Sequence, residues 1–142
     1  KMRDLFSNVK IVTLWDPIDL GTGNTPKVSE IIDTRDFNSC VIHVAYGSIA
    51  DTDATFTVLL EDGDDSGLTD NAAVADAYLN GTELGATPLF SNDNTGFKLG
   101  YVGPKRYVRL TLTPAANTGA ILTSAIAILG DPKLAPQTTQ AV

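Results

Sequence analysis

The stretch KRYVRLTLTP, residues 105–114, alternates apolar and polar side chains with a period of two. Alternation of this kind is typical of a strand that packs one face on a core. The predicted core face carries Val108, Leu110 and Leu112, and the predicted outer face carries Tyr107, Arg109, Thr111 and Thr113. The stretch therefore indicates a β-strand, and the rest of the chain can be compared with it.

Similar alternation recurs along most of the chain, in segments bounded by Gly, Pro, Asn or Asp. The clearest segments are 40–49, 54–63 and 119–132, and weaker ones cover 7–17 and 28–39. Strands at this spacing predict an all-β fold, either an antiparallel β-sandwich or a small barrel, jelly-roll-like in character. The expected core comprises Val44, Phe56, Val58, Val108, Leu110, Leu112, Ile126 and Ile128.

One segment is compatible with a short helix near residues 70–80. In LTDNAAVADAYLNG, residues 68–81, Asp70 or Thr69 is placed to cap the first turn and Gly81 to end the last. Two further segments, 16–27 and 89–100, are rich in Gly, Asn, Thr and Pro and are expected to be loops.

Length and composition favour a single domain. The chain has 142 residues, of which 43% are hydrophobic, and we assign residues 1–130 to one all-β domain and 131–142 to an extended or flexible tail rich in Pro and Gln. A formal net charge of −7 argues against nucleic acid as a partner, because binding phosphates takes a broad basic face. The sequence shows neither a signal peptide nor a membrane span, so we expect no membrane partner and a protein that is made and kept in a cytoplasm.

No motif predicts catalysis, a metal or a cofactor. The run EDGDDSGLTD, residues 61–70, begins like a calcium loop, but Ala73 stands where the bidentate Glu is needed, so we interpret it as a solvated acidic turn. His43 is the only histidine and is expected on a strand face with Val41 and Ala45. Cys40, the only cysteine, is expected to be a buried free thiol. We therefore expect no enzyme, although acidic residues in turns leave a paired-carboxylate hydrolase as a minor alternative.

Positive charge gathers around the opening stretch. Lys98, Lys105, Arg106 and Arg109 fall within a dozen positions of an acidic chain. Arginine and tyrosine are favoured at protein interfaces, because they combine rigid contact area with hydrogen-bonding groups. The alternative is that Arg109 pairs across the sheet with an acidic neighbour. The candidate interface residues are Tyr101, Lys105, Arg106, Tyr107 and Arg109, with Trp15 beside a turn and Pro132, Leu134 and Pro136 in the tail.

Several phrases of the sequence resemble a family of small virion proteins of tailed bacteriophages. The resemblance covers most of residues 5–130, and its most specific part is the Gly-Tyr-x-Gly-x-x-Arg-Tyr-Val-Arg run at 100–109 within FKLGYVGPKRYVRLTL. It extends to ATFTVLLEDGDDSGLTDNAAVADAYLNG at 54–81 and IIDTRDFNSCVIHVAYG at 31–47. Members of this family are regarded as head decoration or cement proteins and are usually encoded beside the major capsid protein.

The resemblance implies a non-enzymatic coat component that binds the major capsid protein on the capsid surface of the virion, often as a homo-trimer. Similar small β proteins also occur in tails and head-completion complexes, which is one alternative. A second alternative is a module that binds carbohydrate or a host surface through its end loops, although Trp15 is the only tryptophan available for such a site. The termini and the Tyr107/Arg109 face, rather than any pocket, are expected to carry the function by contacting neighbouring protein chains.

Overall fold

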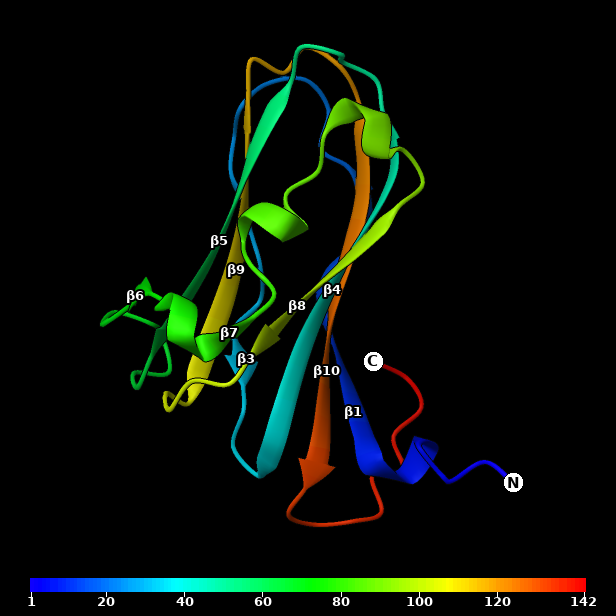
Figure 1. The fold of residues 1–142 in the computed structure, drawn as a ribbon, viewed down its shortest axis with the longest axis vertical. Coiled ribbons are helices and arrows are strands. Elements are labelled where there is room, and N and C mark those ends of the chain that lie inside the picture. Colours follow the sequence, from blue (N-terminus) through cyan, green and yellow to red (C-terminus); the bar gives the residue numbers. More distant parts are fainter.

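The computed structural model describes residues 1–142 as a sandwich of two antiparallel sheets (Figure 1). The first sheet contains, in spatial order, β1 (Val9–Asp19), β10 (Ile121–Pro132), β4 (Phe37–Ile49), β8 (Gly96–Tyr101) and β7 (Leu79–Asn80). The second contains β2 (Lys27–Val28), β9 (Tyr107–Ala115), β5 (Thr55–Gly63) and β6 (Ala72–Ala73), and β3 (Ile32–Asp33) also pairs with β9. The predicted all-β sandwich is confirmed, and the two sheets remain separate rather than closing into a barrel.

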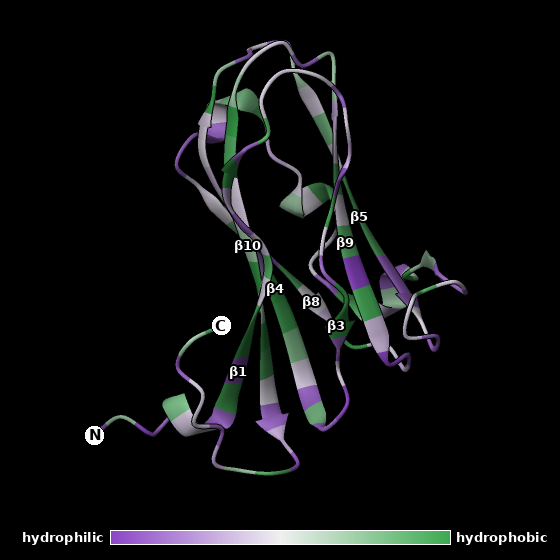
Figure 2. Cartoon of the chain, turned by 180° about the vertical axis from the view of Figure 1, so that it is seen from behind, coloured by the Kyte–Doolittle hydropathy of each residue, from purple (hydrophilic) through white to green (hydrophobic).

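Strands β5 and β9 form the centre of the second sheet and follow the predicted alternation. Val108, Leu110 and Leu112 are fully buried, and Val58 and Leu60 of β5 lie opposite Leu112 and Leu110. Figure 2 shows hydrophobic residues recurring along β4, β5, β9 and β10, the strands that supply most of the core between the sheets. A residue in this region that points inward therefore meets side chains from the opposite sheet.

The prediction for β10 was wrong by one residue. Ala125, Ala127 and Leu129 are buried, whereas Ile126 and Ile128 are only half-buried and lie on the outer face. Both faces of this strand are apolar, so alternation could not indicate which one meets the core. The alanines face inward at the middle of the first sheet, where small side chains let the two sheets approach closely.

No α-helix forms at residues 70–80. The segment holds only β6, the 3₁₀ turn Asp76–Tyr78 and β7, and Gly81 follows with a positive φ of 82°. The remaining 3₁₀ turns are Phe6–Asn8, Leu84–Ala86 and Phe90–Asn92. The side chain of Asp70 is engaged elsewhere, because it accepts hydrogen bonds from the backbone N–H groups of Asp64 and Asp65.

The expected loop at 89–100 also contains a strand. Its second half is β8, which pairs with β4 along its whole length. The glycines that make this segment look like a loop in the sequence are needed for close packing. A Cβ atom on Gly96 would lie 2.4 Å from Nε2 of His43, and a Cβ atom on Gly100 would lie 2.8 Å from Cβ of Asn80. Here glycine marks contact between neighbouring strands rather than a turn.

The two termini lie near the same end of the first sheet (Figure 1). The tail follows β10, and two backbone hydrogen bonds hold it, from Lys133 N to Asp36 O and from Gln137 N to Ser7 O. Its last residues, Thr139, Gln140 and Val142, share a hollow with Val9 and other residues of the N-terminal segment. The tail therefore lies beside the edge of β1 that no strand pairs. No helix of the structure has the length and apolar character needed to cross a membrane.

Candidate protein-docking surfaces

The end of the sandwich where β8 leads into β9 is organised around Tyr101. This side chain is buried, and its hydroxyl group donates to Oδ2 of Asp62 at 2.8 Å and accepts from the backbone N–H of Lys105 at 3.0 Å. Gly103 makes room for the ring, since a Cβ atom there would come within 2.6 Å of three ring and hydroxyl atoms. In the isolated chain Tyr101 thus fixes the turn between the two strands and shows little surface to a partner.

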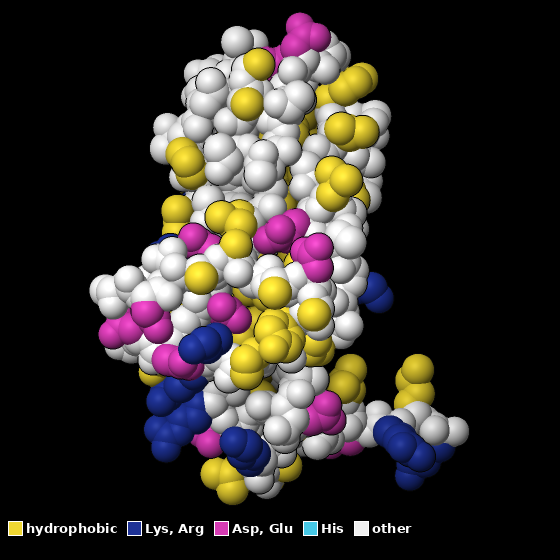
Figure 3. Space-filling model, turned by 60° about the vertical axis from the view of Figure 1, so that its left-hand side comes forward, with side chains coloured by type: hydrophobic (Ala, Val, Ile, Leu, Met, Phe, Trp, Pro, Cys, Tyr) yellow, Lys and Arg dark blue, Asp and Glu magenta, His cyan; other side chains and the backbone are white.

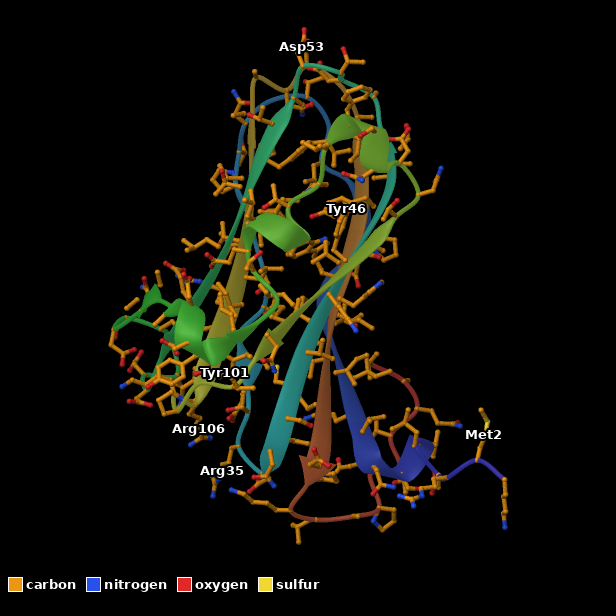
Figure 4. All side chains as sticks on the ribbon, viewed as in Figure 1. Met2, Arg35, Tyr46, Asp53, Tyr101 and Arg106 are labelled. Atoms are coloured by element: carbon orange, nitrogen blue, oxygen red, sulfur yellow. The ribbon has the colours of Figure 1, made fainter.

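Each basic residue of this end has an acidic partner within the chain. Lys105 pairs with Asp64, Arg106 makes two hydrogen bonds of 2.9 Å to Asp33, and Arg109 approaches Glu61 to 2.7 Å. Figure 3 shows Lys and Arg side chains gathered beside Asp and Glu side chains, and Figure 4 shows Arg106 and Arg35 at the same end as Tyr101. The cluster that stands out in the sequence is therefore largely neutralised by its neighbours.

Hydrogen bonds in two of these pairs shift pKa values in the direction that favours the charged forms of Asp33, Arg106 and Lys105. The hydrogen bonds from Arg106 lower the pKa of Asp33 and in turn raise the pKa of the Arg106 guanidinium. The hydrogen bond to Asp64 likewise raises the pKa of Lys105. Lys105 and Arg106 remain partly exposed, so solvent screens both pairs and each contributes little to stability.

Arg109 takes the alternative weighed from the sequence, because it pairs across the sheet with Glu61, the residue directly opposite on β5. The neighbouring outward residues are threonines, with Thr57 opposite Thr113 and Thr111 opposite Leu59. The Arg106 guanidinium lies 4.8 Å from the ring centre of Tyr107, close enough for a cation–π contact. Around Arg109 the outer face of the second sheet is therefore largely polar with its charges paired, and Leu59 and the exposed Val28 are its aliphatic members beside Thr111.

Two carboxylates of the acidic run at 61–70, those of Asp65 and Asp70, are used within the loop. Asp65 accepts from the backbone N–H groups of Gly67 and Thr69, and Asp70 accepts from those of Asp64 and Asp65. These hydrogen bonds lower the pKa values of Asp65 and Asp70. No group of three or more His, Cys, Asp or Glu side chains is arranged to hold a metal ion. In this turn the carboxylates accept hydrogen bonds from backbone N–H groups, in place of backbone carbonyl groups.

The other candidate residues divide between core and surface. Trp15 is buried, and its Nε1–H donates to Oγ1 of Thr123 at 3.4 Å. In the tail Pro132 is half-buried, whereas Leu134 is 75% exposed and Pro136 is exposed. Of the predicted interface residues, the structure brings Tyr101, Lys105, Arg106, Tyr107 and Arg109 together at one end, and it places Trp15 and the tail residues apart from them.

Two strand residues lie as their alternation indicates. His43 points to the outer face of the first sheet, where its ring covers Gly96. Cys40 is a free thiol, half-buried rather than fully buried as expected, and burial raises its pKa to about 12, which favours the protonated thiol at neutral pH. Neither residue has a chemical partner that would make it a nucleophile or a metal ligand.

The outer face of the first sheet was missed in the sequence. Ile11, Ile128 and Val41 lie side by side across β1, β10 and β4, and Ile126 follows between Thr13 and His43. A hollow of about 300 Å³ lies next to this row, bordered by Leu5, Val9, Ser39, Gly130 and Asp131 among others. The available signal was that residues 121–132 are apolar on both faces, because the face of such a strand that does not meet the core forms an additional apolar surface.

Comparison with known proteins bears on the fold. No family model matches the chain, and no curated protein matches it by sequence. Among solved structures, VP2 of the infectious bursal disease virus subviral particle aligns with a TM-score of 0.53 and 14% identity, over 88% of this chain and 32% of that one. The Gx strain of the same virus gives 0.50 and 11%, over 92% and 34%. The SPBc2 prophage-derived protein YomS gives 0.48 and 13%, over 90% and 99%.

The chain thus spans about a third of the length of the viral chains that it matches. At such low identity the similarity shows a shared fold alone, a β-sandwich that also occurs within VP2 of this subviral particle.

Proposed function

We propose that this chain is a non-enzymatic structural protein of a virion, and that it decorates the outer surface of a phage capsid by bridging neighbouring capsid subunits. Its partner is then the major capsid protein, and it binds as a homo-trimer. The observation that carries the proposal is the distribution of contact surface. Both terminal segments carry exposed apolar side chains, Met2, Leu5 and Phe6 in one and Leu134 and Val142 in the other, in addition to those on the body of the sandwich. The basic residues at 105–109, by contrast, pair with acidic residues of the same chain.

The shared fold with a viral capsid protein supports a virion role, and the motif resemblance at 100–109 supports a place on a phage head. The mechanism needs no chemistry at a single site. Many copies with weak contacts, repeated by the symmetry of a shell, add up to a large resistance to internal DNA pressure. The net charge of −7 keeps the protein from competing for the packaged DNA.

A cryo-EM reconstruction of the source particle tests this proposal. We expect density for the sandwich at fixed positions between capsomers, and we expect particles that lack the protein to release DNA at a lower temperature. Density on the tail or baseplate would support the tail-component alternative, and absence from the particle together with specific glycan binding would support the carbohydrate-binding alternative. Either result overturns the proposal.

A matched pair of variants tests the tail as a capsid contact. Leu134 and Leu84 are 75% and 84% exposed and lie in different parts of the chain. We expect Leu134→Asp to weaken binding to stripped particles at least about tenfold, the effect of losing one small apolar contact, and Leu84→Asp to bind like the unaltered protein. Equal binding by the two variants would remove the tail from the interface.

A further inference from the structure

The only Asn-Gly pair of the chain lies at the end of β7. Asn80 is the last residue of this strand, and Gly81 follows in an exposed bend with a positive φ of 82°. Glycine places no Cβ atom beside its own nitrogen and leaves the backbone free to turn, so its nitrogen can approach the side chain of the preceding residue. The pair is therefore a candidate for a covalent change within the chain itself.

Asn80 differs from most asparagines of the chain in having a free side chain. Six of the eight asparagines donate or accept a hydrogen bond through the side-chain amide, namely Asn8, Asn24, Asn38, Asn71, Asn92 and Asn117. The side chains of Asn80 and Asn94 have no such partner. Asn94 precedes Thr95, whose β-branched side chain crowds its own backbone nitrogen. Asn80 alone combines a free side chain with a following glycine.

The backbone nitrogen of Gly81 is also free. Its N–H group donates no hydrogen bond within the chain, and the residue is exposed. Strand β7 has only two residues and pairs with β8 alone, so no strand lies on its other side (Figure 1). A short edge segment of this kind opens locally at low cost. Movement of the Gly81 nitrogen toward the Asn80 side chain therefore breaks no hydrogen bond of that nitrogen.

The surroundings of Asn80 leave room for the reaction and for a negative product. A Cβ atom on Gly100 would lie 2.8 Å from Cβ of Asn80 and 3.6 Å from its Cγ, so the missing side chain of Gly100 leaves space beside the amide. Lys98 lies diagonally across on β8 and takes part in none of the four ion pairs of the molecule. A long side chain can reach such a diagonal neighbour. A carboxylate formed at position 80 would thus have a cation nearby.

We propose that Asn80 is a site of spontaneous deamidation. The Gly81 nitrogen gives up its proton and attacks Cγ of Asn80, the bond between Cγ and Nδ2 breaks, and Nδ2 takes up a proton and leaves as ammonia. The product is a cyclic succinimide. Water then opens the ring at either of its two carbonyl groups, which gives an aspartate or an isoaspartate whose main chain runs through the β-carbon. The sequence of steps needs no cofactor and no oxidant.

Either product alters the edge of the first sheet. A carboxylate replaces a neutral amide, so the formal net charge falls by one from −7. In the isoaspartate an extra carbon enters the main chain of β7, which disturbs the pairing of Asn80 with Gly100. Leu79 packs against the core from the same strand, so residues 76–82 should open more often while the rest of the sandwich stays intact. The inference concerns the chain itself and does not depend on capsid binding.

Peptide mass spectrometry of the folded protein, sampled during incubation at mildly alkaline pH, tests the proposal. We expect the peptide with residues 80–81 to change from amide to carboxyl, with aspartate and isoaspartate both present. The change should be at least about tenfold faster than at any other asparagine, which corresponds to about 1.4 kcal/mol in activation free energy. Hydrogen exchange at residues 76–82 should rise in the modified fraction. An Asn80 that stays intact, or reacts no faster than Asn94, would overturn the proposal.

Two variants separate the effect of the fold from that of the dipeptide. Thr95→Gly places a glycine after the free side chain of Asn94, and Ala72→Gly places one after Asn71, whose side-chain amide donates to the carbonyl of Leu68 at 2.7 Å. We expect the first variant to deamidate at Asn94 at least about tenfold faster than the second does at Asn71. Equal rates would show that a free side chain does not matter and would overturn the argument for Asn80.

Asn80→Gln is the control in the otherwise unaltered chain. Its longer side chain would have to close a larger ring, so the change at position 80 and the rise in hydrogen exchange at residues 76–82 should both be lost. Circular dichroism should show the same β-sheet spectrum as for the unaltered chain, because Asn80 is exposed. A rise in hydrogen exchange that persists in this variant would mean that deamidation of Asn80 is not its cause, and would contradict the proposed effect on β7.

Discussion

Two buried tyrosines use their hydroxyl groups differently. The hydroxyl of Tyr101 has partners in Asp62 and Lys105, whereas that of Tyr46 has none, although its ring packs edge-on against Phe97 at 5.9 Å. Burial raises the pKa of both side chains, so each remains a neutral phenol. Removing a hydroxyl group that has hydrogen-bond partners leaves those partners unsatisfied. Removing a buried hydroxyl group that has no partner relieves the free-energy cost of its desolvation.

We therefore predict opposite outcomes for the same substitution. Tyr101→Phe should lower the free energy of unfolding by about 1–3 kcal/mol, and Tyr46→Phe should leave it unchanged or raise it by up to about 1 kcal/mol. Urea titration followed by circular dichroism measures both. A loss at Tyr46 as large as that at Tyr101 would mean that the Tyr46 hydroxyl has a partner in solution.

The Arg106–Asp33 pair predicts a pH dependence. The folded-state pKa of Asp33 is lowered, chiefly by the hydrogen bonds from Arg106, relative to an ordinary value of 3.8. The unfolded state then binds the proton first as pH falls, so the stability from this pair is complete above the ordinary pKa and is lost as pH drops through the folded value. Acidification from about pH 5 to about pH 2 should thus lower the urea midpoint.

Asp33→Asn and Arg106→Gln should each reduce that acid dependence, by similar amounts, because each removes the same pair. The dependence should not vanish, since Asp51, Asp65 and Asp70 accept backbone hydrogen bonds that lower their pKa values as well. An acid dependence identical to that of the unaltered chain in both variants would show that the pair does not persist in solution.

At the scale of elements, what the sequence could predict depended on how different the two faces of a strand are. In β9 one face is aliphatic and the other holds Thr and Arg, so the register of Val108, Leu110 and Leu112 was predicted and confirmed. In β10 both faces are apolar, and Ile126 and Ile128 were assigned to the wrong side. Hydrophobicity alone favours the larger side chain for the core, whereas packing between two close sheets selects the smaller one.

The inward position of Ala127 can be tested with matched substitutions on one strand. Ala127 is fully buried, while Ser124 points outward and borders a hollow of about 410 Å³ with Ile18 and Leu122. We predict that Ala127→Leu lowers the free energy of unfolding by about 1–3 kcal/mol through overpacking. Ser124→Leu should change it by at most about 0.5 kcal/mol, because the hollow accommodates the added atoms. Chemical denaturation at low protein concentration separates the two, and equal costs would contradict the observed register.

Elements whose position depends on distant partners escaped sequence analysis. β8 was read as a loop because Gly96 and Gly100 interrupt its alternation, and the need for those glycines arises from His43 and Asn80 on other strands. The short helix expected at 70–80 is absent because the candidate capping residue Asp70 instead closes the 64–70 turn. Local patterns could not indicate the contacts of the two glycines, since these join residues whose approach is fixed by the sheets.

At the scale of the whole molecule, the sequence located charge correctly but not its partners. Lys105, Arg106 and Arg109 do gather at one end, yet Asp64, Asp33 and Glu61 reach them from positions 41 to 73 residues away in the chain. Reversing the charge of Arg109 would place like charges side by side in a half-buried pair and would disturb the sheet itself. A docking test is therefore better directed at exposed apolar residues, which have no internal role to lose.

The tail completes the molecule by lying beside the unpaired edge of β1. An exposed strand edge offers free N–H and C=O groups to other chains, and covering it with a loop is a common protection. The tail borders hollows against β1 and the N-terminal segment through Thr139, Gln140 and Val142, and the backbone N–H of Gln137 donates to the carbonyl of Ser7. None of these residues belongs to the core. The tail should thus matter more for solubility than for the stability of the fold.

We predict that deleting residues 134–142 leaves the β-sheet spectrum intact and lowers the melting temperature by no more than about 4 °C, the shift expected for about 1 kcal/mol in a domain of this size. The uncovered β1 edge should make the truncated chain aggregate faster, as measured by light scattering during incubation below the melting temperature. Leu134→Ser in the full chain is the control, because it removes an exposed apolar side chain and leaves the edge covered. Rapid aggregation of both proteins would point to Leu134 itself rather than to the edge. If neither protein aggregated, β1 would need no cover, because its bulges between Thr13 and Ile18 already make the edge irregular and unfit for pairing.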